Sequence, residues 1–265
     1  MPSALVQHLR SRLALFVVPL VLATSCRMIQ AQDETAVVEP DGGAQETLQS
    51  IFVPLLAHAP FSLTLETEWV RPMNNGGTFT LVNKRPIKRD STGRIYEERW
   101  LLAPKGSNAP SRMNWIQIGD PIAHTLYQCN VFKHVCELLT LRDTAKIHYQ
   151  PSLFQSGPLP DGKGTRTHED LGPQFFAGLP VHGYRDTVTL NPGVLGNDLP
   201  LSIVREFGYS SELGINLRSI VDNPQVGRQT FTVTEISTVE PDPAFFQPPQ
   251  GYQIVDHRKS APPVN

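Results

Sequence analysis

The sequence predicts a mainly β protein: a large curved antiparallel meander forming an incompletely closed barrel, with an N-terminal helix and a long irregular insertion. Apolar and polar residues alternate over 61–69 and 230–239, which is typical of strands with one buried face. The chain also has 24 prolines and 19 glycines, many of them between apolar runs. This punctuation favours many short strands joined by turns over a helical bundle.

The first 31 residues predict export. Arg10 and Arg12 precede the apolar run 13–23, which is too short to span a bilayer as a mature helix. Cleavage after the small residue Ala31 would make 1–31 a signal peptide. Residues 22–26 also resemble a lipobox, in which case 1–25 is removed and Cys26 is lipidated. Both alternatives predict a periplasmic or extracellular protein, and only the second predicts an anchor in the envelope.

Composition limits the partners of the remaining chain. Cleavage after Ala31 removes three arginines and no acid, which leaves 20 basic and 25 acidic residues and a net charge of −5. This chain has no basic excess to attract nucleic acid, and no further apolar stretch of about 18 residues to span a membrane. We therefore expect no nucleic acid partner, and membrane contact only through a lipid anchor. The predicted organisation is a tether at 32–43, a single β-rich domain at 44–256 and a flexible tail at 257–265.

The expected elements follow the chain in order. Residues 44–58 predict a helix because Leu48, Ile51, Phe52, Leu55 and Leu56 recur at helical spacing, with an end or kink near Val53 imposed by Pro54. Ten strands are then expected, at 61–69, 78–88, 94–103, 113–118, 124–129, 136–141, 174–190, 201–209, 215–221 and 230–239. Pro241–Pro243 predicts a short turn of helix.

Cys129 and Cys136 predict a structural disulfide. A four-residue hairpin loop at 131–134 would place the two cysteines opposite each other, at a position where Cα atoms come close enough for a bridge. An oxidising compartment would favour that bond. The pair lacks the C-x-x-C spacing of a redox site and the additional ligands of a metal site.

Residues 150–170 interrupt the strand pattern. The segment is rich in proline, glycine, serine and charge and has no clear period, so it predicts either a mobile lid or a disordered insertion. His168, Glu169 and Asp170 within it are interpreted as a solvated charge run rather than as metal ligands. His182, in a predicted strand, is interpreted as structural.

Two segments carry a resemblance to known proteins. The blocks GLPVHGYRDTVTL, GNDLPLSIVREFGYSSELGINL and FTVTEISTVEPDPAFFQPPQGY within 178–252, and DSTGRIYEERW with WIQIGDPIAHTLYQC within 69–129, resemble a family of uncharacterised exported bacterial proteins. A helix, a long meander and the closing PDPAFFQPPQGY are more distantly similar to the periplasmic lipoprotein-carrier superfamily. That resemblance implies a half-barrel whose concave side holds acyl chains. The chain departs from the carriers, which have several covering helices and for which a cysteine hairpin is not a hallmark. No lipoprotein-handling arginine is matched residue by residue, so no binding residue is carried over.

Nine strand-face apolar residues are the candidate ligand-binding residues. They either line the concave face or form a packed core, and they are Phe61, Leu63, Leu65, Trp69, Phe79, Leu81, Trp100, Trp115 and Ile116. The carboxylate pairs Glu66/Glu68 and Glu97/Glu98 fit a solvent face better than a catalytic cleft. We find no nucleophile with a base, no metal set and no cofactor motif, so no cofactor is expected.

The main hypothesis is therefore a non-catalytic exported protein that binds an apolar ligand, a lipid or an acylated protein. The first alternative is a membrane-anchored interaction module that uses Cys26 as its anchor and a sheet edge or residues 150–170 as its contact surface. The second alternative is a hydrolase acting on envelope polymers.

Overall fold

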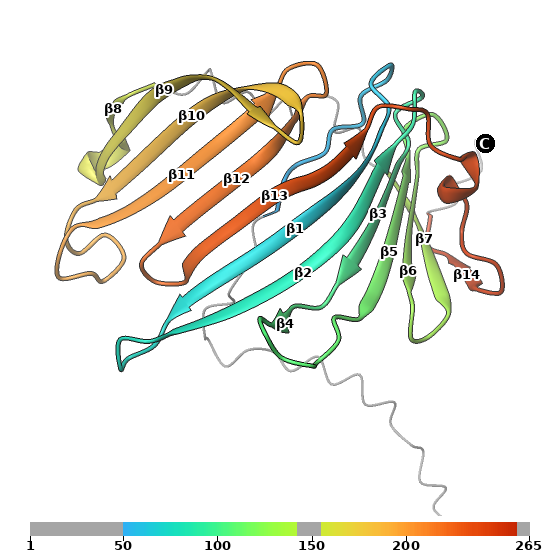
Figure 1. The fold of residues 1–265 in the computed structure, drawn as a ribbon, viewed down its shortest axis with the longest axis horizontal. Helices are drawn as coiled ribbons and strands as arrows, with labels where there is room; N and C mark the ends of the chain where they lie inside the picture. The colour runs from blue at the N-terminus through green and yellow to red at the C-terminus, as the bar shows by residue number, and fades with distance from the viewer. Residues whose placement is uncertain (1–49, 142–154, 259–265) are drawn as a thin grey trace, which may run out of the picture. The chain divides into compact units, whose positions relative to one another are not determined.

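The computed structural model describes residues 50–141 and 155–258, all of them within one compact unit, 46–265. These residues form a single sheet of 14 strands (Figure 1). The strands are β1 (Phe61–Pro72), β2 (Thr78–Arg89), β3 (Ile95–Trp100), β4 (Ala103–Pro104), β5 (Met113–Asp120), β6 (Thr125–Asn130), β7 (Val135–Thr140), β8 (Gly157–Pro158), β9 (Gly164–Phe176), β10 (Leu179–Leu190), β11 (Leu201–Ser210), β12 (Ile215–Asn223), β13 (Gly227–Ser237) and β14 (Gln253–Asp256). Two 3₁₀ helices, η2 (Pro160–Gly162) and η3 (Pro243–Phe246), complete the described elements.

The strand order confirms a large open sheet and revises its topology. The order is β14-β7-β6-β5-β3-β2-β1-β13-β12-β11-β10-β9-β8, with β4 beside β2, and the two edge strands do not pair with each other. A single meander in chain order was predicted. The structure instead has two antiparallel meanders, β1–β7 and β8–β13, joined where β1 pairs with β13. One pair, β14 with β7, is parallel.

Several predictions fall outside this description. The signal peptide, both cleavage sites, Cys26 and the tether at 32–43 lie in residues that the structure does not describe. Within the described ranges, no helix has the length and apolar character needed to cross a bilayer.

The central strand β1 has the predicted alternation. Phe61, Leu63 and Leu65 are buried, whereas Glu66 and Glu68, further along the strand, face the opposite side of the sheet. The buried face packs with side chains of β2, β12 and β13 into the main core cluster. Its other members are Ile51, Ile87, Val181, Leu213, Ile215, Leu217, Phe231 and Val233. Burying each large apolar side chain contributes about 1.5–3 kcal/mol, so this face is the main source of stability.

Residues 50–60, which we call the strap, run along the far side of the sheet in Figure 1. The buried Arg89 of β2 fastens the strap, because its Nε and Nη1 donate to the carbonyl oxygens of Ala59 (2.9 Å) and Pro54 (3.0 Å). Its Nη2 donates to the carbonyl of Leu213 (2.7 Å) in the β11–β12 turn. Burial lowers the pKa of Arg89 to about 10, so the guanidinium stays charged at neutral pH.

The strap replaces part of the predicted helix. Residues 50–56 have no regular secondary structure, so the helix expected over 44–58 is absent from the described part of that segment. Pro54 lacks the amide that a helix would need, and its carbonyl is bound by Arg89 instead. Gly93, at φ +88°, lies under the strap, where a Cβ would come within 3.3 Å of the backbone of Leu55 and Leu56.

The cysteine hairpin agrees with the prediction. β6 and β7 are joined by the four-residue loop 131–134, and Cys129 and Cys136 lie opposite each other with a disulfide between them. Both are fully buried in a second apolar cluster with Ile116, Ile118 and Phe246. Phe246 comes from η3, the predicted turn of helix, where the Asp242 carboxylate accepts from the Ala244 amide (2.9 Å).

The segment predicted as an irregular insertion is in part a strand. Residues 164–170 belong to the 13-residue strand β9, which pairs with β10 throughout its length. The pattern is obscured by glycines and charges and by a bulge near Gly183. Residues 142–154 lie outside the described residues.

Replacing Arg89 by methionine tests the fastening of the strap. The change leaves three carbonyl oxygens without their donor, at about 1–3 kcal/mol for each buried group that stays unsatisfied. We expect the free energy of unfolding to fall by at least about 3 kcal/mol in urea titrations. The matched control is Lys88→Met on the opposite face of the same strand, which should change it by less than about 1 kcal/mol. Equal losses in the two variants would show that Arg89 has no special role.

Replacing both Cys129 and Cys136 by alanine tests the disulfide. The loop that it closes is short, so its loss should lower the free energy of unfolding by about 2–3 kcal/mol. Reductant should destabilise the wild type by a similar amount and leave the double variant unchanged. A double variant that remains sensitive to reductant would contradict this assignment.

Candidate functional site

An apolar cleft lies between the strap and the sheet. It has a volume of about 240 Å³, and its lining comes from the strap and from strands β3, β5 and β6. The apolar lining residues are Ile51, Phe52, Val53, Leu55, Ile95, Gly119, Leu126 and Leu141. Gly119 forms part of the wall without a side chain, and a Cβ placed there would meet Leu55 and Leu141 only at van der Waals distance, 3.7 and 3.8 Å. The cleft is therefore a site for an apolar group.

A smaller polar chamber adjoins this cleft. It has a volume of about 170 Å³ and is lined by Ser50, Thr67, Asn83, Arg85, Arg99, Trp100 and Phe231. Arg99 lines both the chamber and the cleft, where Glu97 and Gln117 are the other polar lining residues. The two hollows thus share Arg99, and the apolar strap residues line the cleft but not the chamber.

Two guanidinium groups share one carboxylate at this junction. Arg85, which is buried, binds Glu97 and the hydroxyl of Ser50. Arg99 places Nη2 3.1 Å from the second oxygen of Glu97, and its Nε donates to the side-chain oxygen of Gln117 (3.1 Å). Burial lowers the pKa of Arg85, and the attraction of Glu97 opposes that effect. The group of three ionised side chains carries a net positive charge.

The chamber also contains an amide with an unused acceptor. The Nδ2 of Asn83 donates to the carbonyl of Trp100 (2.6 Å), which fixes the orientation of the amide. Its Oδ1 is buried and accepts no hydrogen bond from the described residues. Thr67 beside it, on β1, is also buried.

The nine apolar residues singled out from the sequence are distributed over several places. Phe61, Leu63 and Leu65 lie in the main core cluster, and Ile116 lies in the cysteine cluster. The other five lie outside these two clusters, and two of them donate a hydrogen bond. Trp69 donates to the carbonyl of Val226 (2.8 Å), Phe79 is 43% exposed, Leu81 and Trp115 are partly buried, and Trp100 donates to Glu98 (2.6 Å). Of the nine, Trp100 alone lines the chamber, and whether the others contact a ligand stays a prediction.

Most of the lining residues are not among those that the sequence pattern singles out. The strap residues were assigned to a helix, so their position opposite β3 and β5 was not foreseen. Arg85 and Arg99 were not singled out from the sequence. Ile95, Glu97 and Arg99 share one face of β3, and all three are partly buried. An apolar residue at this spacing was the available signal that the charged pair lies near the interior.

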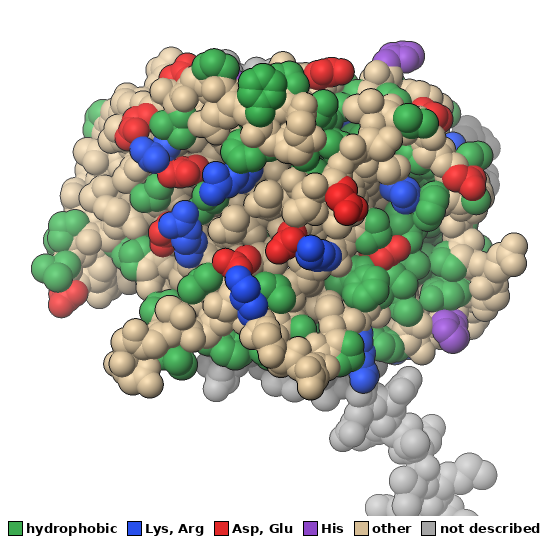
Figure 2. Space-filling view, in the orientation of Figure 1, with side chains coloured by type: hydrophobic (Ala, Val, Ile, Leu, Met, Phe, Trp, Pro, Cys, Tyr) green, Lys and Arg blue, Asp and Glu red, His purple; other side chains and the backbone are tan. Residues whose placement is uncertain are grey.

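The opposite face of the sheet carries paired charges. Lys84 binds Glu66 at 2.9 Å and Lys105 binds Glu68 at 2.5 Å, which gives the predicted carboxylate pair structural partners. Figure 2 shows acidic and basic side chains next to one another across the face it presents. A hollow of about 470 Å³ beside β4 includes both lysines, but exposed ion pairs such as these contribute little energy.

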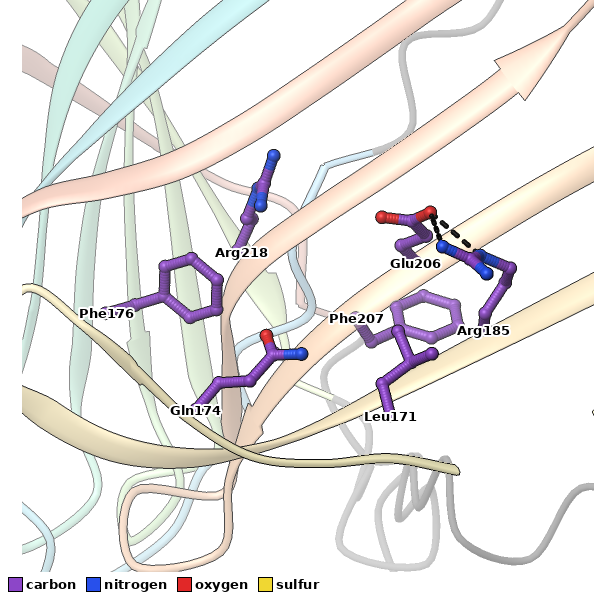
Figure 3. Close-up of a pocket in the computed structure, with 8 residues that line it drawn as sticks. Leu171, Gln174, Phe176, Arg185, Glu206, Phe207 and Arg218 are labelled. Atoms are coloured by element: carbon purple, nitrogen blue, oxygen red, sulfur yellow. Dashed lines mark hydrogen bonds and ion pairs between the residues drawn. The ribbon is translucent and has the colours of Figure 1, made fainter. Parts of the chain in front are cut away.

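A pocket of about 320 Å³ on strands β9–β12 is a weaker candidate (Figure 3). In it Arg185 is neutralised by Glu206 through contacts of 2.8 and 2.9 Å. Gly208 lacks a side chain here because the ring of Phe176 lies over it, and a Cβ would approach that ring to 2.6 Å. The protein's own side chains therefore occupy much of this surface.

The histidines of β9 and β10 have carboxylate partners. His168 lies 2.7 Å from Asp186, and His182 lies 2.5 Å from Asp170, with both imidazoles stacked on Tyr184. The hydrogen bond with His182 lowers the pKa of Asp170. The predicted solvated charge run is thus partly an ordered cross-strand arrangement. Among the residues that the structure describes, no group of three or more His, Cys, Asp or Glu could hold a metal ion.

The sequence matches no protein-family model, and it matches no curated protein. Solved structures give partial likenesses. An uncharacterized conserved protein from Thermus thermophilus is 9% identical, with 76% of this chain and 91% of that chain covered and a TM-score of 0.37.

Two further structures are similar over most of this chain. MucB in the MucA/MucB complex of Pseudomonas aeruginosa is 16% identical, with 74% of this chain and 58% of that chain covered and a TM-score of 0.36. A putative exported protein with a YmcC-like fold from Bacteroides fragilis is 11% identical, with 71% and 100% covered and a TM-score of 0.26. Uncharacterised and exported proteins are thus among the neighbours, as the sequence resemblance predicted. At these TM-scores, none of them bears on the function of this chain.

Proposed function

We propose that this protein is an exported, non-catalytic binding protein that takes the apolar chain of a lipid or an acylated protein into the cleft beneath the strap. The observation that supports this proposal is the cleft itself, whose strap wall is apolar and whose sheet wall places apolar residues beside Glu97, Arg99 and Gln117. Each methylene moved from water into such surroundings contributes about 0.8 kcal/mol. The cleft is smaller than the roughly 300–1,000 Å³ of a pocket for a drug-sized ligand, so it would hold part of a chain.

A second candidate function is binding of a partner protein at the edge of the sheet. Strand β9 has 13 residues, but β8 pairs only with Thr165 and Arg166. The amide of His168 points to this edge and is bound by the hydroxyl of Ser156 (2.8 Å). Phe175, further along the strand, is 74% exposed. Such an edge can accept an added strand.

Filling the cleft tests the first proposal. Gly119→Leu would place a branched side chain where the ligand chain is expected, and Gly119→Ala would add a single methyl. We expect affinity for a fluorescent fatty acid to fall about tenfold or more in the leucine variant, since about two methylenes of burial are lost. The alanine variant should bind nearly as the wild type, and thermal unfolding should show that the leucine variant is still folded at the temperature of the assay. Wild-type affinity in a folded leucine variant would contradict the proposal.

Site-specific photo-crosslinking tests the second candidate. A photoreactive residue at position 175 should give a discrete adduct with one envelope protein, because the side chain lies beside the open edge. The same residue at position 122, which is 71% exposed in the β5–β6 turn, is the control. Equal adducts at both positions would indicate nonspecific contact and would remove this candidate.

A further inference from the structure

The polar chamber offers two unused interactions to a molecule that reaches it. Nη1 of Arg99 makes no hydrogen bond or ion pair with the described residues, and the side chain is 43% exposed. A guanidinium donor in that position suits an anionic oxygen, because charge-assisted hydrogen bonds are the stronger ones.

The second interaction is at Asn83. This residue is only 9% exposed, and its Oδ1 lacks a donor within the described part of the chain. Nδ2 donates to the carbonyl of Trp100. A rotation of the amide that brought Oδ1 to a donor would therefore break that hydrogen bond. A buried acceptor left without a donor is unfavourable. Oδ1 has almost no accessible surface, so a ligand hydroxyl that displaces the side chains covering it would be favoured there.

The chamber is positively charged overall and shares the side chain of Arg99 with the cleft. Arg85 and Arg99 face a single carboxylate, that of Glu97, and the other chamber residues are uncharged. Arg99 lines both hollows, so a molecule with its chain in the cleft would have its polar end at Arg99.

We propose that the ligand is an anionic amphiphile with a hydroxyl group close to its anionic group. The anionic oxygen binds Arg99, and the hydroxyl donates to Oδ1 of Asn83. This inference rests on the proposed function, since it assigns the polar end of a molecule whose chain occupies the cleft. It distinguishes the ligand from a neutral lipid and from a simple fatty acid.

Calorimetric titration with amphiphiles of one chain length tests each contact separately. The probes are 3-hydroxydodecanoate, dodecanoate and 1-dodecanol, each below its micelle concentration, with the purified protein. We expect 3-hydroxydodecanoate to bind about tenfold more tightly than dodecanoate, and dodecanoate about tenfold more tightly than the alcohol. A fourth probe is a 12-carbon lysophosphatidic acid, which carries both a hydroxyl and a phosphate. Tighter binding of this probe than of 3-hydroxydodecanoate would identify the anionic group as a phosphate. The reverse order would identify it as a carboxylate.

Two variants assign the contacts. Arg99→Gln should abolish the preference for dodecanoate over dodecanol, and Asn83→Ala should abolish the preference for the hydroxylated acid. Each result is the ratio of the affinities of two probes for the same variant. A uniform loss of affinity caused by altered folding would therefore leave the ratio unchanged. Lys105→Gln removes the same charge on the opposite face and should keep both ratios.

The outcomes separate this inference from the function on which it rests. Tight but equal binding of all probes would leave the proposed function in place and overturn the assignment of the polar end. Binding of none of them would overturn both. Ratios that persist in the Arg99 and Asn83 variants would also overturn the assignment.

Discussion

The three hydrogen bonds of Arg89 hold together parts of the chain that share no strand pairing. The side chain belongs to β2, but the carbonyls it binds belong to the strap and to the β11–β12 turn. A buried guanidinium must find acceptors, because an unpaired charge in the interior is expensive. Here the acceptors are two carbonyls of the irregular strap and one of a turn, which would otherwise be unsatisfied themselves. The hydrogen bonds that fix the strap therefore also offset the cost of burying the charge of Arg89.

The position of the strap decides where the sheet can bind a ligand. Over β1, β12 and β13 the interior is filled by the main core cluster, to which the strap contributes Ile51. Over β3, β5 and β6 the strap and the sheet are not in full contact, and the absence of a side chain at Gly119 leaves room between them. The charged residues between the cleft and the chamber both compensate a buried charge and offer a donor to a ligand. Glu97 keeps Arg85 neutralised, and Arg99 extends from the same carboxylate toward the cleft.

Local features of this fold were predictable from the sequence, and distant pairings were not. The alternation in β1 and the cysteine hairpin depend on neighbours within a few residues, so spacing alone identifies them. The pairing of β1 with β13 joins residues such as Thr64 and Glu235, which are 171 apart, and no spacing rule reports it. The strap was missed for another reason. Its apolar residues do recur at helical spacing, but Pro54 and the demand of Arg89 for carbonyl oxygens favour an irregular path.

The pairing of β1 with β13 also sets the order in which the sheet can be completed. β1 is among the first described segments to be synthesised, and its partner on one side is among the last. Until that partner arrives, a strand carrying Phe61, Leu63 and Leu65 has an open edge, which is a surface prone to aggregation. Contacts between such distant segments also slow folding. The centre of the sheet therefore cannot be completed until residues 227–237 are available, so this edge of β1 stays unpaired until most of the chain has emerged.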